Sequence, residues 1–249
     1  MNSSLQNKVV LVTGGARRIG AEIVRTLHGA GARVAIHYRS AATEAQGLAA
    51  TLNQQRADSA VTLGMDLLDT SNLPQLIAGV IERFGRLDAL VNNASSFFAT
   101  PLGSIGEDEW QDLIGANLKA PLFLTQAAAP WLRAAQGAVV NITDIHAARP
   151  LKNYPLYCAA KAGLAGLTQA LALELAPEVR VNAVAPGAIQ WPEGDAFSAA
   201  ARAAIIEHSL LKRCGDANDV ARAVLFLLAD APYVTGHTIA VDGGRLTRL

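Results

Sequence analysis

The chain has 249 residues, of which 51% are apolar, and it carries 21 basic and 21 acidic side chains, so its formal net charge is zero. This balance argues against a nucleic-acid-binding surface, and Cys158 and Cys214 are too few for a disulfide framework or a zinc cluster. No signal peptide and no run of 18 apolar residues is visible. We therefore expect a cytoplasmic protein without a membrane span or a metal site.

Short apolar runs alternate with longer stretches of helical period. In chain order the predicted strands are Lys8–Thr13, Arg33–Tyr38, Val61–Met65, Leu87–Val91, Gly137–Ile142, Val179–Val184 and His237–Val241. The predicted helices between them are Gly20–Gly29, Thr43–Gln55, Asn72–Phe84, Asp108–Leu132, Leu156–Leu175 and Asp216–Leu228. Wholly apolar strands separated by helices indicate a parallel sheet covered on both faces. We predict one α/β domain over residues 1–249, with a Rossmann-type doubly wound sheet of seven strands.

The least regular stretch is Pro186–Ser209, which follows the sixth predicted strand and contains Pro186, Gly187, Pro192 and Gly194. Ligands of doubly wound sheets bind beyond the carboxyl ends of the strands. This position makes the stretch a candidate substrate lid, with an ordinary surface excursion as the alternative.

A glycine-rich turn, Thr13–Gly20 (TGGARRIG), lies directly between the first predicted strand and helix. Small residues let the backbone approach a pyrophosphate, and the helix N-terminus supplies N–H donors and a positive dipole end. Arg17 and Arg18 add a positive charge that a purely structural turn does not need. The candidate cofactor-binding residues of this turn are Gly14, Arg17, Arg18, Ile19 and Gly20.

The end of the second predicted strand indicates which dinucleotide is used. NAD-binding proteins carry Asp or Glu there, which accepts a hydrogen bond from the ribose 2′-hydroxyl. This chain has Tyr38, Arg39 and Ser40 instead, and no carboxylate. Arg39 can pair with a 2′-phosphate, Ser40 can donate to it, and Arg17 lies nearby in the turn. The sequence therefore predicts NADPH rather than NADH.

Tyr157 and Lys161 are four residues apart on a predicted helix and so share one face. A free tyrosine, with a pKa of about 10, exchanges protons poorly at neutral pH. A neighbouring ammonium group favours the phenolate and lowers that pKa, which makes Tyr157 a candidate general acid.

Further motifs occur in a fixed order: Asn92-Asn93-Ala94 after the fourth strand, Asn117 in the next helix, and Pro186-Gly187 after the sixth strand. With the glycine-rich turn and Tyr-x-x-x-Lys, they make the chain resemble the short-chain dehydrogenase/reductase family over nearly its whole length. The resemblance implies that Asn92 stabilises the sheet beside the cofactor and that Asn117 holds a water in a proton relay to Lys161. It also implies a homotetramer packed through the helices that contain Asn117 and Tyr157. Leu164, Leu167 and Leu171 are candidate contacts there, with a place in the core as the equal alternative. The further cofactor-binding residues that it implies are Asp66, Leu67, Asn93, Ala94, Ser95, Lys161, Pro186 and Gly187.

Two positions depart from the main branch of that family. Asp144 replaces a serine thirteen residues before Tyr157, and Arg18 replaces a glycine. A carboxylate can accept from N–H groups or share a proton with Tyr157, which suits a nitrogen heterocycle better than a ketone. Arg18 must point into or across the cofactor cleft and could reach a substrate oxygen.

Both departures, and the run Asn93–Phe97 (NASSF), resemble the pteridine reductase subfamily. The resemblance implies that Phe97 stacks on a pterin ring, that Ser95 bonds pterin and cofactor, and that Tyr154 lines the substrate mouth. Stacking of a flat heterocycle on an aromatic face is physically favourable. The C-terminal tail through Arg248 is also similar to that subfamily, whose terminal arginine reaches a neighbouring subunit.

The resulting hypothesis is NADPH-dependent reduction of a pterin or folate. Hydride goes to a C=N carbon, and Tyr157 delivers the proton with help from Asp144, Lys161 and Asn117. Reduction of a dihydropterin can instead draw its proton from water. One alternative is a ketoreductase of the same fold that acts on a 3-oxoacyl thioester or another carbonyl substrate. A second is a non-enzymatic NADPH-binding regulator.

Overall fold

The computed structural model describes residues 5–191 and 198–248. Its centre is a parallel sheet of seven strands in the order β3-β2-β1-β4-β5-β6-β7. The strands are β1 Val9–Val12, β2 Arg33–Tyr38, β3 Ala60–Gly64, β4 Ala89–Asn92, β5 Ala138–Ile142, β6 Arg180–Pro186 and β7 Thr238–Val241. The predicted doubly wound fold is confirmed, because the strand order reverses between β1 and β4.

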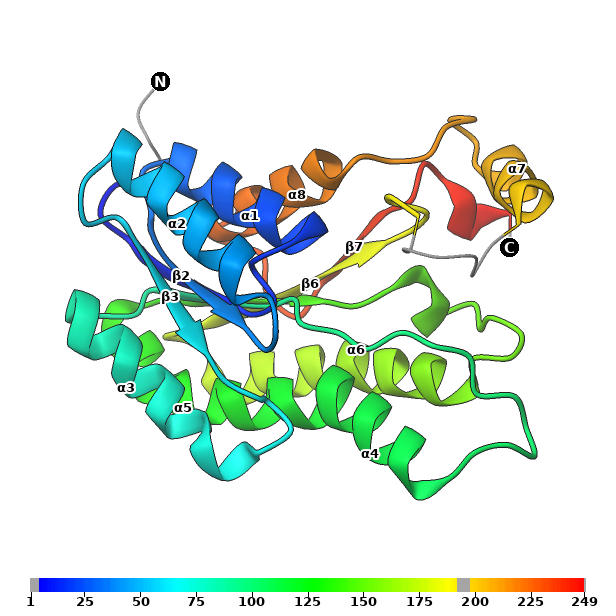
Figure 1. Cartoon of the computed structure of the whole chain (residues 1–249), viewed down its shortest axis with the longest axis horizontal. Helices are drawn as coiled ribbons and strands as arrows, with labels where there is room; N and C mark the ends of the chain where they lie inside the picture. The colour runs from blue at the N-terminus through cyan, green and yellow to red at the C-terminus, as the bar shows by residue number, and fades with distance from the viewer. Residues whose placement is uncertain (1–4, 192–197, 249) are drawn as a thin grey trace.

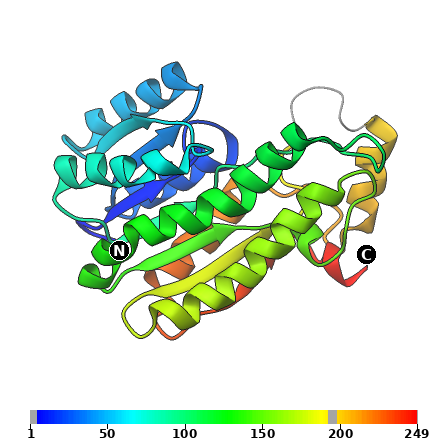
Figure 2. The same ribbon diagram turned by 90° about the horizontal axis from the view of Figure 1, so that it is seen from below.

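Helices cover both faces of this sheet, as Figures 1 and 2 show. One face carries α1 Arg18–Gly29, α2 Ala42–Gln55 and α8 Ala217–Ala229. The other face carries α3 Leu73–Phe84, α4 Glu107–Ile114, α5 Ala120–Ala135 and α6 Pro155–Leu175. A further helix, α7 Ala199–His208, lies at one end of the molecule beside the C-terminal segment.

Two apolar cores form because successive strand residues point to opposite faces. In β1, Val10 and Val12 pack with α1 and α8, whereas Val9 and Leu11 pack with α3 and α5. All four side chains are fully buried. This explains why the strand appears in the sequence as one uninterrupted apolar run rather than as an alternating one.

Two helical regions differ from the sequence prediction. The predicted helix Asp108–Leu132 extends over Glu107–Ala135, and a π-helical turn, Gly115–Lys119, interrupts it. The stretch predicted to be irregular, Pro186–Ser209, contains α7, which was missed. Ser198 caps this helix by accepting a hydrogen bond from Ala201 N at 3.2 Å, and the alanine-rich run that follows favours helix. Residues 192–197 of the candidate lid, including Pro192 and Gly194, lie outside the described residues.

Helix α6 is long and apolar enough, by length and composition alone, to cross a membrane. In the fold it packs against the sheet: Leu164 is buried, and Leu171 packs on the core formed with α3 and α5. Leu164 therefore belongs to the core, and Leu171 is partly buried against it. Leu173 is 82% exposed on the same helix and is a better candidate for the predicted oligomer contact.

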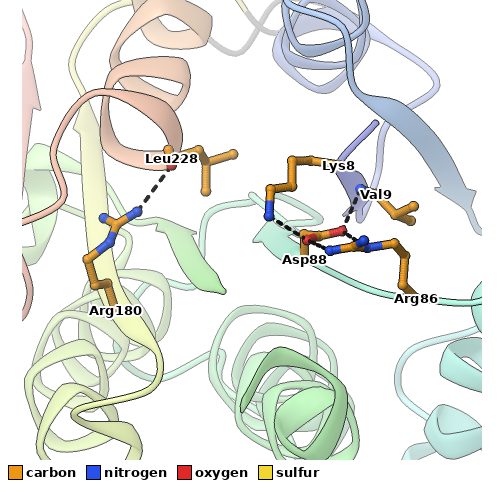
Figure 3. A network of polar contacts seen from close by, with 6 residues as sticks. All are labelled: Lys8, Val9, Arg86, Asp88, Arg180 and Leu228. Atoms are coloured by element: carbon orange, nitrogen blue, oxygen red, sulfur yellow. Dashed lines mark hydrogen bonds and ion pairs between the residues drawn. The ribbon is translucent and has the colours of Figure 1, made fainter. Parts of the chain in front are cut away.

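Charged side chains hold together the amino ends of the strands. Asp88, just before β4, accepts hydrogen bonds from Lys8 Nζ (3.0 Å), Val9 N (2.9 Å) and both Arg86 Nε (2.8 Å) and Nη2 (2.6 Å) (Figure 3). Arg180, the first residue of β6, donates to the carbonyl groups of Leu227, Leu228 and Ala231 at the end of α8. Each of these groups therefore has its partners within the chain.

Candidate active site

A cavity of about 650 Å³ opens at the carboxyl ends of the strands. It contains most of the candidate site residues, although they come from segments far apart in the sequence. Those that line it are Gly14, Arg17, Arg18, Ile19, Gly20, Arg39, Asp66, Leu67, Asn93, Ala94, Ser95, Phe97, Asp144, Tyr157, Lys161, Pro186 and Gly187. Four candidates do not line it: Tyr38, Ser40, Asn117 and Tyr154.

The glycine-rich turn is shaped for close backbone approach. Gly14 has φ +59°, in the left-handed region that favours glycine. A Cβ atom on Gly20 would lie 2.1 Å from the carbonyl oxygen of Gly14, so only glycine fits there. The turn and the start of α1 thus form a compact cradle that a pyrophosphate group fits.

Buried side chains fix this turn to neighbouring strands, and the sequence analysis missed them. Thr13 Oγ1 accepts from the backbone N atoms of Asn93 (2.9 Å) and Ala94 (3.0 Å). His37 Nδ1 accepts from Gly14 N (3.2 Å), while His37 Nε2 lies 3.0 Å from the carbonyl oxygen of Met65. Burial lowers the pKa of His37, so a neutral ring that accepts at Nδ1 and donates at Nε2 fits both contacts.

Arg18 spans the cleft. Its Nη2 donates to the carbonyl oxygens of Gln190 (3.1 Å) and Trp191 (3.2 Å), which follow β6. Arg18 also has φ +51°, in the left-handed region that favours glycine. The side chain therefore occupies a strained backbone position in order to reach across the cavity.

The two arginines expected to hold a 2′-phosphate both have carboxylate partners. Arg17 pairs with Glu44 at the start of α2, and Arg39 Nη1 lies 4.0 Å from Asp112 Oδ2 on α4. All four side chains are at least partly exposed, and exposed ion pairs contribute little free energy. A phosphate group could therefore replace either carboxylate.

The remaining cofactor candidates lie around the ends of β2 and β3. Tyr38 does not reach the cavity, because its ring packs on Gly64 of β3, where a Cβ atom would lie 2.9 Å from the ring. Ser40 is exposed outside the cavity. Asp66 lines the cavity, and its Oδ1 accepts from Leu68 N (3.0 Å), while Leu67 is buried beside it.

Asp144 and Tyr157 form the chemical centre of the cavity. Tyr157 Oη donates to Asp144 Oδ2 at 2.8 Å, and Asp144 Oδ1 accepts from His146 N at 2.7 Å. One carboxylate thus caps the turn after β5 and also holds the tyrosine. Burial raises the pKa of Tyr157 well above its usual value, and the negative charge of Asp144 raises it further. The phenol is therefore protonated and poised as a donor.

Lys161 lies one helical turn below Tyr157 and is almost fully buried. Its Nζ donates to the carbonyl oxygen of Ile142 at 2.8 Å and lies 5.7 Å from the centre of the Tyr157 ring. Burial lowers the pKa of Lys161 to about 8, and Asp144 opposes that shift. The expected lowering of the Tyr157 pKa was wrong, because burial and the charge of Asp144 both raise it.

Asn117 lies in the π-helical turn, and such turns are frequent at functional sites. Its Oδ1 accepts from Ser95 Oγ (2.7 Å), and its Nδ2 donates to the carbonyl oxygens of Ser96 (2.9 Å) and Leu113 (3.0 Å). The side chain is fully buried and outside the cavity. It therefore positions Ser95, and no direct hydrogen bond joins it to Lys161 within the described part of the chain.

Phe97 forms an aromatic wall together with two tyrosines. Its ring stacks on Tyr154 (centroids 4.7 Å apart, 11° between planes) and meets Tyr157 edge-on at 4.8 Å. Tyr154 was expected to line the substrate mouth. It instead packs on one face of the Phe97 ring and is not among the residues that line the cavity. The edge-on contact holds the Phe97 ring against the Tyr157 ring, and Phe97 itself lines the cavity that a flat ring could enter.

The chain matches a family model described as enoyl-(acyl carrier protein) reductase over residues 14–245. It is also 37% identical to pteridine reductase 1 of Leishmania tarentolae, with both chains covered in full. The chain belongs to the short-chain dehydrogenase/reductase family, and it is an oxidoreductase that uses a nicotinamide dinucleotide.

Other relatives are similar at nearly the same level. The 3-oxoacyl-acyl-carrier-protein reductase FabG of Staphylococcus epidermidis is 36% identical, with 96% of this chain and 98% of that protein covered. The short chain dehydrogenase/reductase astE of Aspergillus oryzae is 35% identical, with 97% and 95% covered. The level of sequence identity therefore does not indicate which substrate the enzyme uses, and that question depends on the residues of the site.

Proposed function

We propose that this enzyme reduces pterins, from dihydropterin or folate compounds to their tetrahydro forms, with NADPH as the hydride donor. The observation that carries the proposal is the 2.8 Å hydrogen bond between Tyr157 Oη and Asp144 Oδ2 inside the cavity. A serine at position 144 would offer a neutral hydroxyl suited to a carbonyl oxygen. A carboxylate suits a substrate that presents N–H groups.

The neighbouring residues support the same substrate class. Phe97 offers an aromatic face to a planar heterocycle, and Arg18 brings a guanidinium across the cleft towards electron-rich oxygen atoms. Arg17 and Arg39 support NADPH, since each can exchange an exposed carboxylate partner for the 2′-phosphate.

The chain's own residues then handle the proton. The reduced nicotinamide, when bound, supplies the hydride to a C=N carbon. Tyr157 donates its proton to the nitrogen of that bond, which leaves a C–H and an N–H bond in the product. Asp144 orients the phenol, and the charged Lys161 beside the ring stabilises the phenolate that remains.

The test is consumption of NADPH with a panel of dihydropterins, folates, a 3-oxoacyl thioester and simple ketones. Turnover of the dihydropterins or folates, without turnover of the thioester or the ketones, supports the proposal. Turnover of the thioester or ketones alone refutes it and supports a ketoreductase, the candidate that the similarity to FabG favours.

We also propose a cytoplasmic homotetramer that packs through α5 and α6. The support is the family resemblance together with exposed apolar side chains on these helices, including Phe123, Trp131 and Leu173. Analytical ultracentrifugation tests it, and a monomer at micromolar concentration would contradict it.

A further inference from the structure

The C-terminal segment places an arginine in the cavity, and nothing above assigns it a role. Arg245 begins a short turn, Arg245–Thr247, that follows β7. It is only 7% exposed and lines the cavity together with Asp144. The sequence resemblance included the tail that contains Arg245, but it assigned a role only to the terminal arginine, Arg248, and none to Arg245.

The backbone around Arg245 is firmly held. Asp242 accepts from Gly244 N (2.8 Å) and Leu246 N (2.6 Å), on either side of the arginine. The carbonyl oxygen of Gly243 accepts from Ser209 Oγ and Leu211 N, each at 3.1 Å, in the segment after α7. The direction of the Arg245 side chain is therefore set by the fold rather than by a frayed chain end.

The guanidinium is buried but not satisfied. Its Nε has no hydrogen-bond partner among the described residues. Asp144 and Asp242 are near enough to interact with it electrostatically, yet neither forms a close ion pair with it in the part of the chain that the structure describes. A buried donor without a partner is costly, so the fold leaves the hydrogen bonding of this guanidinium incomplete.

The position of Arg245 favours the substrate rather than the cofactor. The phosphate groups of the cofactor are already assigned to the glycine-rich turn, Arg17 and Arg39, which lie at the β1–α1 and β2–α2 connections. Arg245 instead lines the same cavity as Asp144, the residue that bonds Tyr157, and lies near enough to be affected by its charge. A cation beside that carboxylate lets the site present a donor and an acceptor to one substrate.

We propose that Arg245, which lines the cavity, is a substrate-binding residue whose guanidinium group donates to an oxygen atom of the substrate. That oxygen belongs either to the carbonyl of the heterocyclic ring or to an oxygen-bearing substituent on the ring. The proposal rests on the proposed function for the identity of the ring, but the requirement for an oxygen acceptor does not depend on it.

The test compares Arg245→Met with Arg245→Lys and with the surface control Arg222→Met. Each is assayed with a dihydropterin that has a hydroxylated side chain and with one that has a methyl group instead. The Met variant should raise KM about 10-fold to 100-fold, and the Lys variant should raise it less, because it keeps the charge but not the planar donor. Arg222→Met should behave as the wild type.

The two substrates separate the two oxygen sources. A KM increase confined to the hydroxylated substrate places the acceptor on the side chain, and an increase with both places it on the ring. Unchanged KM with both substrates would overturn the proposal. So would a loss of NADPH affinity, measured by fluorescence titration, or a shifted pH–rate profile at constant KM, since the latter would mean that Arg245 only positions Asp144.

Two controls keep this test separate from the proposed function. If the wild type reduces the 3-oxoacyl thioester but no pterin, the proposed function fails, and the same KM comparison is made with the thioester, which also presents oxygen acceptors. If Arg245→Met does not fold, as judged by its thermal unfolding, the Lys variant decides: an unchanged KM then contradicts the proposal.

Discussion

Charged side chains at the two ends of the central sheet differ in how completely they are hydrogen-bonded. At the amino ends, Asp88 accepts four hydrogen bonds (Figure 3). Arg180 donates to three carbonyl groups, of which Figure 3 draws that of Leu228. At the carboxyl ends, Lys161 has a single carbonyl partner, and Arg245 Nε has none among the described residues. Satisfied charges stabilise the fold, whereas partly satisfied charges stay available to a ligand.

The largest expected effect is at the carboxyl end. Tyr157→Phe removes the proton donor but keeps the ring that contacts Phe97, so kcat for reduction of the fully oxidised pterin should fall about 10³-fold. Stopped-flow and steady-state rates measure this loss. The control is Tyr233→Phe, which alters a fully exposed tyrosine. A Tyr157→Phe variant that keeps its rate would remove Tyr157 from the chemistry.

The matching change at the amino end is Asp88→Asn, which should lower stability and leave kcat unchanged. Burial by itself raises the pKa of Asp88, but hydrogen bonds from Arg86, Val9 N and Lys8 outweigh it and hold the pKa below its usual value. The variant should lose about 1–3 kcal/mol of unfolding free energy in urea titrations.

The pH dependence of that loss follows from the lowered pKa. The carboxylate's contribution is present above the unfolded-state pKa of about 3.9 and is lost as the pH falls through the lower folded-state value. The difference between wild type and variant should therefore be full at pH 7 and shrink in acid. A loss of kcat at pH 7 with unchanged stability would break the contrast between the two ends.

The lowered pKa of Lys161 predicts how the reaction rate depends on pH. Because its pKa is about 8, the ammonium form that stabilises the phenolate is lost as the pH rises through that value. We expect kcat/KM to fall about tenfold per pH unit above it. Asp144→Asn removes the charge that holds this pKa up, so the alkaline limb should move to lower pH. An unchanged limb in the variant would show that another group controls it.

The smallest effect concerns the cofactor. Arg39→Ala should reduce the preference for NADPH over NADH by about tenfold, since one charge-assisted contact to the 2′-phosphate is lost. The ratio of kcat/KM for the two cofactors measures it. The comparison variant, Asp112→Asn, frees Arg39 from its carboxylate partner and should leave or increase the preference. Equal ratios in wild type and Arg39→Ala would exclude Arg39 from cofactor selection.

The fold could be predicted because its signals are local. Uninterrupted apolar strands and helices of regular period gave the seven-stranded sheet, and Thr13–Gly20 marked the edge that carries the cavity. Helix α7 was missed because Pro186, Gly187 and the residues after them gave the stretch an irregular composition that concealed the alanine run starting at Ala199. The π-helical turn has no distinct period and could not be seen in the sequence.

The site was harder to predict where it depends on long-range contacts. The spacing of Tyr157 and Lys161 could be read from one helix, but the pKa of Tyr157 depends on burial and on Asp144, which tertiary packing brings to 2.8 Å. Tyr154 was assigned to the mouth although it lies behind Phe97. Arg245 reaches the cavity only because β7 brings the end of the chain there.

The central claim is that Asp144 makes this a pterin site, and Asp144→Ser tests it most directly. The measurement is the ratio of kcat/KM for a dihydropterin to that for a 3-oxoacyl thioester, in wild type and variant. We predict a wild-type ratio well above one that falls by at least about tenfold in the variant, because serine suits a carbonyl oxygen and not an N–H group. An unchanged ratio, or a wild type that prefers the thioester, would contradict the account.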